Sequence, residues 1–427
     1  MKPSTRRDFL KFSAAAGLAA QAGPLAGNLF AAPAAYSRRG GKTMVVIYLR
    51  GGADPLHMLV PYGDEHYRRH RPTLRMSLED GLIQLDDMFG LHPAMGGLQR
   101  AWNDGALAPI ACAGSVHPTR SHFDAQDWME FAAPGNRTVR DGWLNRYLAS
   151  THTEDASEFR ALGMQELLPR SLRGLYPVLA VPRSMNSEKG DRTLDTFEKF
   201  YGDGSDIMEG GSEMMGRREE DAAGVVESGR ITIETLRRFR EIVSGQKKRQ
   251  AGDTVSGSVY PEGGFGSALE QIALVIKADA GLEVAGLDYG GWDDHTNQGD
   301  TEGRMADRMR SVFNGLGAFY QDLGPRMKDT TVLVMTEFGR TVKENGNGGT
   351  DHGHGGSMWV LGGGVKGGKV HGTWDGLERS ALYQGRDLPT NTDFRDVFAT
   401  VMANGLEFEP GADFFPDHKP RLLKDLY

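Results

Sequence analysis

Short apolar runs alternate with amphipathic segments along most of the chain. The first run, residues 43–49, is apolar at nearly every position, as is typical of a strand covered by helices on both faces. Comparable runs occur at 107–113, 159–164, 282–287, 331–335 and 358–361. Helical periodicity lies between them, at 82–103, 121–131, 265–280, 303–323 and 393–404. This alternation predicts an α/β fold with a doubly wound, mainly parallel sheet.

Residues 184–257 interrupt this alternation. The stretch is polar and charged, it has Gly/Ser-rich flanks, and its pattern is helical over 227–243. We therefore expect a helical insertion or cap on the sheet, within one domain that spans residues 35–427.

The N-terminus has the features of an export signal. Residues 5–11 read TRRDFLK, which matches the twin-arginine pattern, and an Ala/Gly-rich run with a small-x-small cleavage site at 32–34 follows. Polar residues and proline interrupt the run, so we expect a signal peptide over 1–34 and no stable membrane span. The expected partner during export is the twin-arginine translocase, and the expected location is periplasmic or extracellular.

The amino-acid composition argues against disulfide bonds within the chain and against one class of partner. Cys112 is the single cysteine, so no disulfide can form within the chain. The formal net charge is −8, and no stripe of Lys and Arg is present, which argues against nucleic acid as a partner.

Polar clusters follow several of the expected strands. They include Asp54, the segment 115–122, the segment 293–295, Glu337 with Arg340, and a glycine-rich loop that holds Asp351, His352 and His354. Ligands of open α/β sheets bind outside the carboxyl ends of the strands, so we expect these clusters to converge there. Imidazole and carboxylate together suit a divalent metal, with Zn, Mn, Fe and Ca as candidates. A pair of ions about 4 Å apart would need roughly six protein ligands.

Five of these segments together resemble the signature set of the DUF1501 family. They are RGGAD at 50–54, RSHF at 120–123, GWDDH at 291–295, TEFGRT at 336–341 and GTDHG at 349–353. The order and spacing match along essentially the whole mature chain. The resemblance implies an alkaline phosphatase/sulfatase-like fold, twin-arginine export and metal-assisted ester hydrolysis.

Specific roles follow from the resemblance. It implies Asp54 as a ligand after the first strand, and Ser121, or Thr119, as the nucleophile at a helix N-terminus. It further implies that Asp293 and His295 serve one metal, while Asp351 and His352 serve a second.

The residues themselves add three candidates, and several alternatives stay open. Arg120 could hold an anion, His122 could act as general base or ligand, and His354 could be a further ligand. Equally, Ser121 could be a plain N-cap, Asp54 a turn former, and His354 a surface group. Arg120 could instead pair with Asp124, and Glu337 with Arg340.

The chain departs from the superfamily pattern at two places. Val116 stands two residues before Pro118, where a sulfatase has its Cys or Ser nucleophile, so a formylglycine sulfatase is not expected. Glu337-Phe338 stands where an Asp-His pair usually ends a strand, and Phe338 cannot bind a metal.

Two functional hypotheses follow. The first is an exported, metal-dependent hydrolase of a phosphate or sulfate ester, whose substrate is a small molecule or a polymer. The second is a non-catalytic periplasmic binding or assembly protein that retains the hydrolase fold and part of the metal site.

Overall fold

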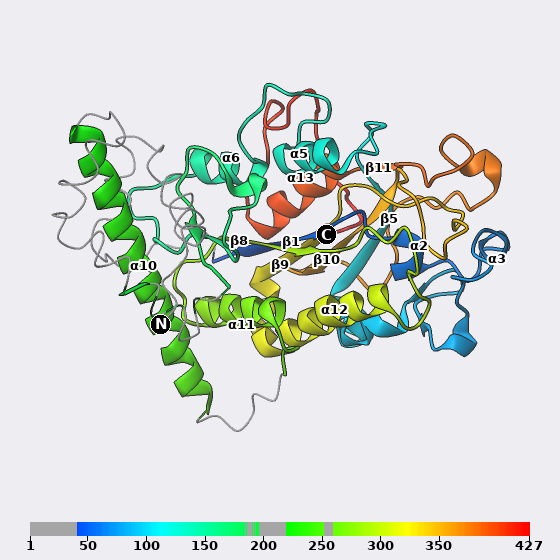
Figure 1. Ribbon diagram of the computed structural model, residues 1–427, viewed down its shortest axis with the longest axis horizontal. Helices are drawn as coiled ribbons and strands as arrows, with labels where there is room; N and C mark the ends of the chain where they lie inside the picture. The colour runs from blue at the N-terminus through cyan, green and yellow to red at the C-terminus, as the bar shows by residue number, and fades with distance from the viewer. Residues whose placement is uncertain are drawn as a thin grey trace.

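The computed structural model describes residues 41–183, 219–251 and 259–427, together with residues 185, 190, 192, 194 and 195. The expected signal peptide at 1–34 lies outside the described residues, as does most of the first half of the expected insertion. Figure 1 shows a central sheet with helices above and below it.

The central sheet has eight strands in the order β11-β5-β10-β9-β1-β8-β6-β7. Every neighbouring pair is parallel except those of β10, which runs antiparallel to both β5 and β9. The predicted α/β class and large, mainly parallel sheet are therefore confirmed. The strands are β1 (Thr43–Arg50), β5 (Leu107–Gly114), β6 (Ala161–Gly163), β7 (Leu179–Ala180), β8 (Val284–Gly290), β9 (Thr330–Met335), β10 (Gly356–Gly362) and β11 (Thr392–Asp393).

Helices cover both faces of the sheet, and the alternation within β1 explains why. Val45 and Ile47 join the core on the side of α11 and α12, whereas Met44 and Val46 join the core on the side of α6 and α13 (Figure 1). A strand buried on both faces must be apolar at consecutive positions, as β1 is. The helices are α5 (His122–Phe131), α6 (Trp143–Ser150), α10 (Glu219–Ala251), α11 (Gly264–Lys277), α12 (Arg304–Leu323) and α13 (Phe394–Gly405).

The long helix α10 belongs to the expected insertion. The helical pattern at 227–243 lies within it, and the helix extends beyond that pattern at both ends. Leu236 and Phe239 of α10 are buried in the same core as Leu269 and Ile272 of α11. Among the described helices, none combines the length and apolar character that crossing a membrane requires.

The prediction of a single helix over 82–103 is wrong. That segment instead forms the short strands β3 (Ile83–Gln84) and β4 (Gly90–Leu91), a 3-10 helix at Pro93–Leu98 and the short helix α4 (Gln99–Asn103). Pro93 lacks a backbone N–H and so can only begin a helix. A Cβ at Gly97 would meet the backbone of Asn314 in α12 at 2.6 Å, so glycine there permits close helix packing. Strand β4 joins β3 to β2 (Leu59–Val60) in a second, three-stranded sheet.

The direction of β10 determines which loops meet at one edge of the central sheet. The carboxyl ends of β1, β5, β8 and β9 share that edge because these strands run in the same direction. Since β10 is antiparallel, its amino end also lies there, together with the loop 350–355 that precedes it. The histidines of this loop therefore reach the same edge as the residues that follow β8.

Candidate metal centre

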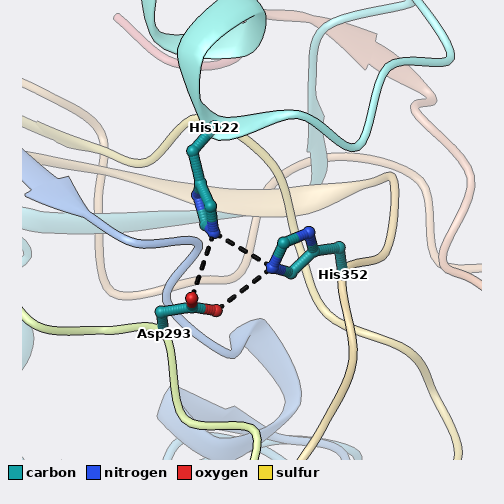
Figure 2. A group of neighbouring side chains, drawn as sticks. All are labelled: His122, Asp293 and His352. Carbon is teal, nitrogen blue, oxygen red and sulfur yellow. Dashed lines mark hydrogen bonds and ion pairs between the residues drawn. The ribbon is translucent and has the colours of Figure 1, made fainter.

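Three side chains from distant parts of the chain converge at this edge. His122 lies in the first turn of α5, Asp293 in the loop after β8, and His352 in the loop before β10 (Figure 2). One ligand atom from each of the three lies within 4.8 Å of the other two. The three residues are close enough to hold one metal ion.

Interatomic distances bring a third histidine into this group. The Nε2 atom of His352 lies 3.0 Å from Nε2 of His122, 3.0 Å from Nε2 of His295 and 3.1 Å from Oδ1 of Asp293. Nε2 of His295 is also 3.0 Å from Oδ1 of Asp293. Zinc ligands at about 2.0–2.1 Å in a tetrahedron are separated by about 3.3 Å, close to these values.

A hydrogen-bond acceptor holds the other nitrogen of each ring. His122 Nδ1 is 2.8 Å from Glu337 Oε1, His295 Nδ1 is 3.0 Å from Asp351 Oδ1, and His352 Nδ1 is 2.8 Å from the carbonyl oxygen of Arg120. These acceptors place the ring proton on Nδ1, which leaves an Nε2 lone pair on each neutral ring. The Nε2 lone pair of His352 then faces those of His122 and His295, and facing lone pairs repel unless a proton or a metal cation lies between them.

Glu337 is the buried residue that orients His122. Its Oε1 atom accepts from His122 and also from the backbone N–H of Gly51 at 2.9 Å and Gln126 Nε2 at 2.9 Å. Its Oε2 atom accepts from Thr336 Oγ1 at 3.1 Å. Glu337 therefore contacts a candidate ligand rather than Arg340, the partner that the sequence suggested for it.

Arg340 joins the loops that carry the ligands. Its side chain is buried, and it donates to Asp293 Oδ1 at 2.6 Å. The remaining acceptors are backbone carbonyls of residues after β1, after β8 and before β10, namely Gly51, Gly52, Trp292 and Thr350. The guanidinium thus fixes three loops relative to one another.

The electrostatics of the centre favour a cation. Burial raises the pKa of the Asp293 carboxyl, but Arg340 and the histidines outweigh this effect and lower the pKa to about 2. Burial likewise opposes ionisation of Glu337 and Asp351, yet hydrogen bonds, chiefly from His122 and His295 respectively, leave both pKa values below the ordinary value. With neutral imidazoles, three carboxylates and one guanidinium leave a net charge of −2, which a divalent ion would balance.

The histidines differ in basicity. The hydrogen bond to Glu337 raises the pKa of His122 above its usual value. Burial lowers the pKa of His352. Protons therefore compete for His122 at a higher pH than for His352, and metal binding is expected to weaken as the pH falls.

Ser121 and Arg120 lie beside this centre, immediately before His122. Ser121 is the N-cap residue of α5, but its side chain makes no capping hydrogen bond, so the plain N-cap alternative lacks its usual contact. The Arg120 guanidinium donates to Asp387 at 2.6 Å and to Gln384 at 3.0 Å. The alternative pairing of Arg120 with Asp124 is wrong, because Asp124 pairs with Arg137.

Asp54 lies outside the group of convergent ligands. Its buried carboxylate pairs with Arg71 at 2.6 Å, accepts from Gln298 at 2.9 Å and caps α2 (Pro55–Met58) through the N–H of Leu56. These contacts use both carboxylate oxygens and favour the structural alternative for this residue.

His354 also stands apart from the convergent ligands. Its ring stacks on Tyr383 with centroids 4.1 Å apart, and burial lowers its pKa to about 4. The two histidines of this loop, each followed by a glycine, have different surroundings, and of the two it is His352 that contacts Asp293.

Replacing Glu337 tests the hydrogen bond that orients His122. We expect Glu337→Gln to weaken metal affinity by about 10- to 100-fold, because an amide is a weaker acceptor for the His122 N–H and raises its basicity less. Titration with a competing chromophoric chelator measures the affinity. Glu344→Gln is the matched control, since Glu344 accepts from Thr73 and Leu74 and makes no contact with the centre. Equal affinities of the two variants would remove Glu337 from the proposed site.

The chain matches one protein family over most of its length. The family is described as "Protein of unknown function (DUF1501)", and the match covers residues 41–409. This range includes every residue of the metal centre and all strands of the central sheet. No curated protein and no solved structure matches the chain.

Proposed function

We propose that this chain, which belongs to the DUF1501 family, is an exported metal-dependent hydrolase of a phosphate or sulfate ester. The observation that supports the proposal is the convergence of three imidazole Nε2 atoms on the Asp293 carboxylate, at 3.4 Å for His122, 3.0 Å for His295 and 3.1 Å for His352. Each imidazole has its Nδ1 atom held by an acceptor, which is the arrangement found around metal-ligating histidines.

The donor set fits one ion rather than two. His122, His295, His352 and Asp293 supply three nitrogens and one oxygen, a combination that suits Zn and also Mn or Fe. Ca favours oxygen ligands and fits this set less well. Asp351, expected as a ligand of a second ion, accepts from His295 and Asn345 and so acts through His295.

The surroundings of the centre fit ester hydrolysis. A bound divalent ion would supply Lewis-acid polarisation of an ester oxygen and would ease deprotonation of a nearby hydroxyl. Asp293 and His295 are 43% and 41% exposed at the side chain, so a substrate can reach the centre. Ser121 adjoins His122 and supplies a hydroxyl without a capping hydrogen bond, and is therefore the proposed nucleophile.

The fold and the N-terminus complete the proposal. A mainly parallel sheet with its candidate ligands at the carboxyl edge supports an alkaline phosphatase-like arrangement. The twin-arginine motif at residues 5–11 supports export through the translocase to the periplasm or beyond. The ester could belong to a small molecule or to a polymer.

Hydrolysis assays on the metal-loaded protein test this function. We expect turnover of an aryl phosphate or an aryl sulfate, and we expect Ser121→Ala to lower kcat at least about a thousandfold with metal content unchanged. Ser244→Ala on α10 is the matched control, because in the described part of the chain the Ser244 hydroxyl donates to the carbonyl of Glu241 and contacts no residue of the centre. Unchanged kcat in Ser121→Ala would exclude Ser121 as the nucleophile.

One observation favours the non-catalytic alternative. Phe338 packs against the rings of His122 and His352, with centroids 4.9 Å and 5.1 Å away, so an apolar group borders the centre where a further ligand could stand. A periplasmic binding or assembly protein could use such a site to hold one ion without turnover. A metal-loaded protein that hydrolyses neither class of ester would support this alternative.

A further inference from the structure

We propose that Arg120 and Arg386, held together by Asp387, form a binding subsite for a phosphate or sulfate oxyanion beside the metal centre. The inference rests on the proposed function for its position in the reaction. The subsite itself is defined by residues that do not ligate the metal.

A single buried carboxylate holds the two arginines. Asp387 has no exposed side-chain surface, and its Oδ2 atom accepts from Arg120 Nη2 at 2.6 Å, Arg120 Nε at 3.2 Å and Arg386 Nη1 at 3.4 Å. Its Oδ1 atom is buried without a hydrogen-bond partner in the described part of the chain. The carboxylate therefore fixes the two guanidiniums near each other through one oxygen atom.

Both arginines are attached to the same metal-ligand residue. The carbonyl oxygen of Arg120 accepts from His352 Nδ1 at 2.8 Å, and Arg386 Nη2 donates to the carbonyl oxygen of His352 at 3.1 Å. The positive charge of Arg386 also contributes to the lowered pKa of Asp351. The pair therefore lies next to the metal centre and is hydrogen-bonded to the loop that carries His352.

The two guanidiniums retain donors and exposed surface. Their side chains are 28% and 42% exposed, and Arg120 Nη1 and Arg386 Nε make no hydrogen bond to described residues. Two guanidiniums and one carboxylate leave a net charge of +1. An oxyanion that bridges the free donors would relieve the repulsion between the two cations and match their planar geometry.

Two other arginines near the centre already donate to acceptors of the protein. Arg340 is buried and directed at Asp293 and backbone carbonyls. Arg50 forms ion pairs with Glu130 at 3.0 Å and Asp288 at 2.6 Å. Unlike Arg340 and Arg50, Arg120 and Arg386 combine exposure with donors that make no hydrogen bond to described residues.

The subsite predicts which class of molecule binds there and which product should inhibit the reaction. A tetrahedral dianion such as phosphate or sulfate offers several oxygen acceptors to the two guanidiniums, whereas a neutral ester offers no charge. If the ester-hydrolysing function holds, the released inorganic anion should inhibit in competition with the substrate.

Calorimetric titration of inorganic phosphate and sulfate into the metal-loaded protein tests the subsite. We expect Arg386→Gln and Arg120→Gln each to weaken anion binding at least about tenfold, because each loses a positive charge and its free charge-assisted donor, with metal content unchanged. Arg386→Lys keeps the charge but not the fork geometry, and an intermediate loss is expected. Arg137→Gln is the matched control, because Arg137 is an exposed arginine paired with Asp124 outside this cluster.

The outcomes separate this inference from the proposed function. Anion affinity equal to wild type in both glutamine variants, or no anion binding by the wild type, would overturn the subsite even if metal is bound and esters are hydrolysed. Loss of anion binding in the arginine variants of a protein that hydrolyses no ester would support the subsite and contradict the hydrolase function.

Discussion

His352→Ala is expected to lower the affinity of the chain for its divalent metal at least about a hundredfold. The Nε2 atom of His352 lies within 3.1 Å of a donor atom from each of His122, His295 and Asp293, so its removal opens the centre of the ligand set. Replacing a residue that hydrogen-bonds to a metal ligand typically lowers metal affinity 10- to 100-fold, and replacing a ligand itself should lower it further. Competition with a chromophoric chelator measures the change.

The matched control is His354→Phe, two residues further along the same loop. Phenylalanine can retain the stacking of the ring on Tyr383, and His354 makes no contact with Asp293 or with the other histidines of the centre. We expect this variant to bind metal as the wild type does. Equal metal affinity in His352→Ala and the wild type would contradict the site as described.

Arg340→Met is expected to lower the free energy of unfolding by about 3–5 kcal/mol. The buried guanidinium donates to the partly exposed Asp293 and to four backbone carbonyls, and its removal leaves several buried acceptors without a donor, at about 1–3 kcal/mol each before local relaxation. Methionine fills similar volume but offers no donor, so those acceptors lose their partner. Urea unfolding of the metal-free protein separates this effect from the metal contribution.

An exposed arginine provides the control for this variant. Arg326 is 40% exposed and pairs with Asp279, so Arg326→Met should change the free energy of unfolding by no more than about 1 kcal/mol. Arg340→Lys should lie between the two, because a lysine cannot reach acceptors on three loops at once. If Arg340→Met is as stable as Arg326→Met, the three loops do not depend on this guanidinium.

The sheet was predictable because its strands are buried on both faces. Consecutive apolar residues in β1, β5 and β9 stand out from the surrounding sequence, whereas the short strands β3 and β4 lack such a signal. The apolar spacing of segment 82–103 predicts one helix, because it does not show that Gly97 must contact the backbone of α12. That requirement comes from tertiary packing, about which the local spacing of apolar residues carries no information.

The sequence indicated several of the side chains that converge in the candidate site, but not the residues that hold them. His295, His352 and Asp293 stand in glycine-rich segments whose residue types suggest metal binding. The contact of Glu337 with His122 joins residues 215 positions apart, and no local pattern indicates it. Asp54 also follows a strand, as Asp293 does, yet its carboxylate forms an ion pair with Arg71. The roles of Arg71, Arg386 and Asp387 likewise depend on contacts that form only when the chain folds.

The central claim is that one divalent ion binds between His122, His295, His352 and Asp293. Elemental analysis of the purified, folded full-length chain tests it most directly, with the content of Zn, Mn, Fe and Ca measured per chain after exhaustive dialysis. The proposal predicts close to one equivalent of a single divalent metal. No bound metal, even after incubation with each ion before dialysis, would contradict the account.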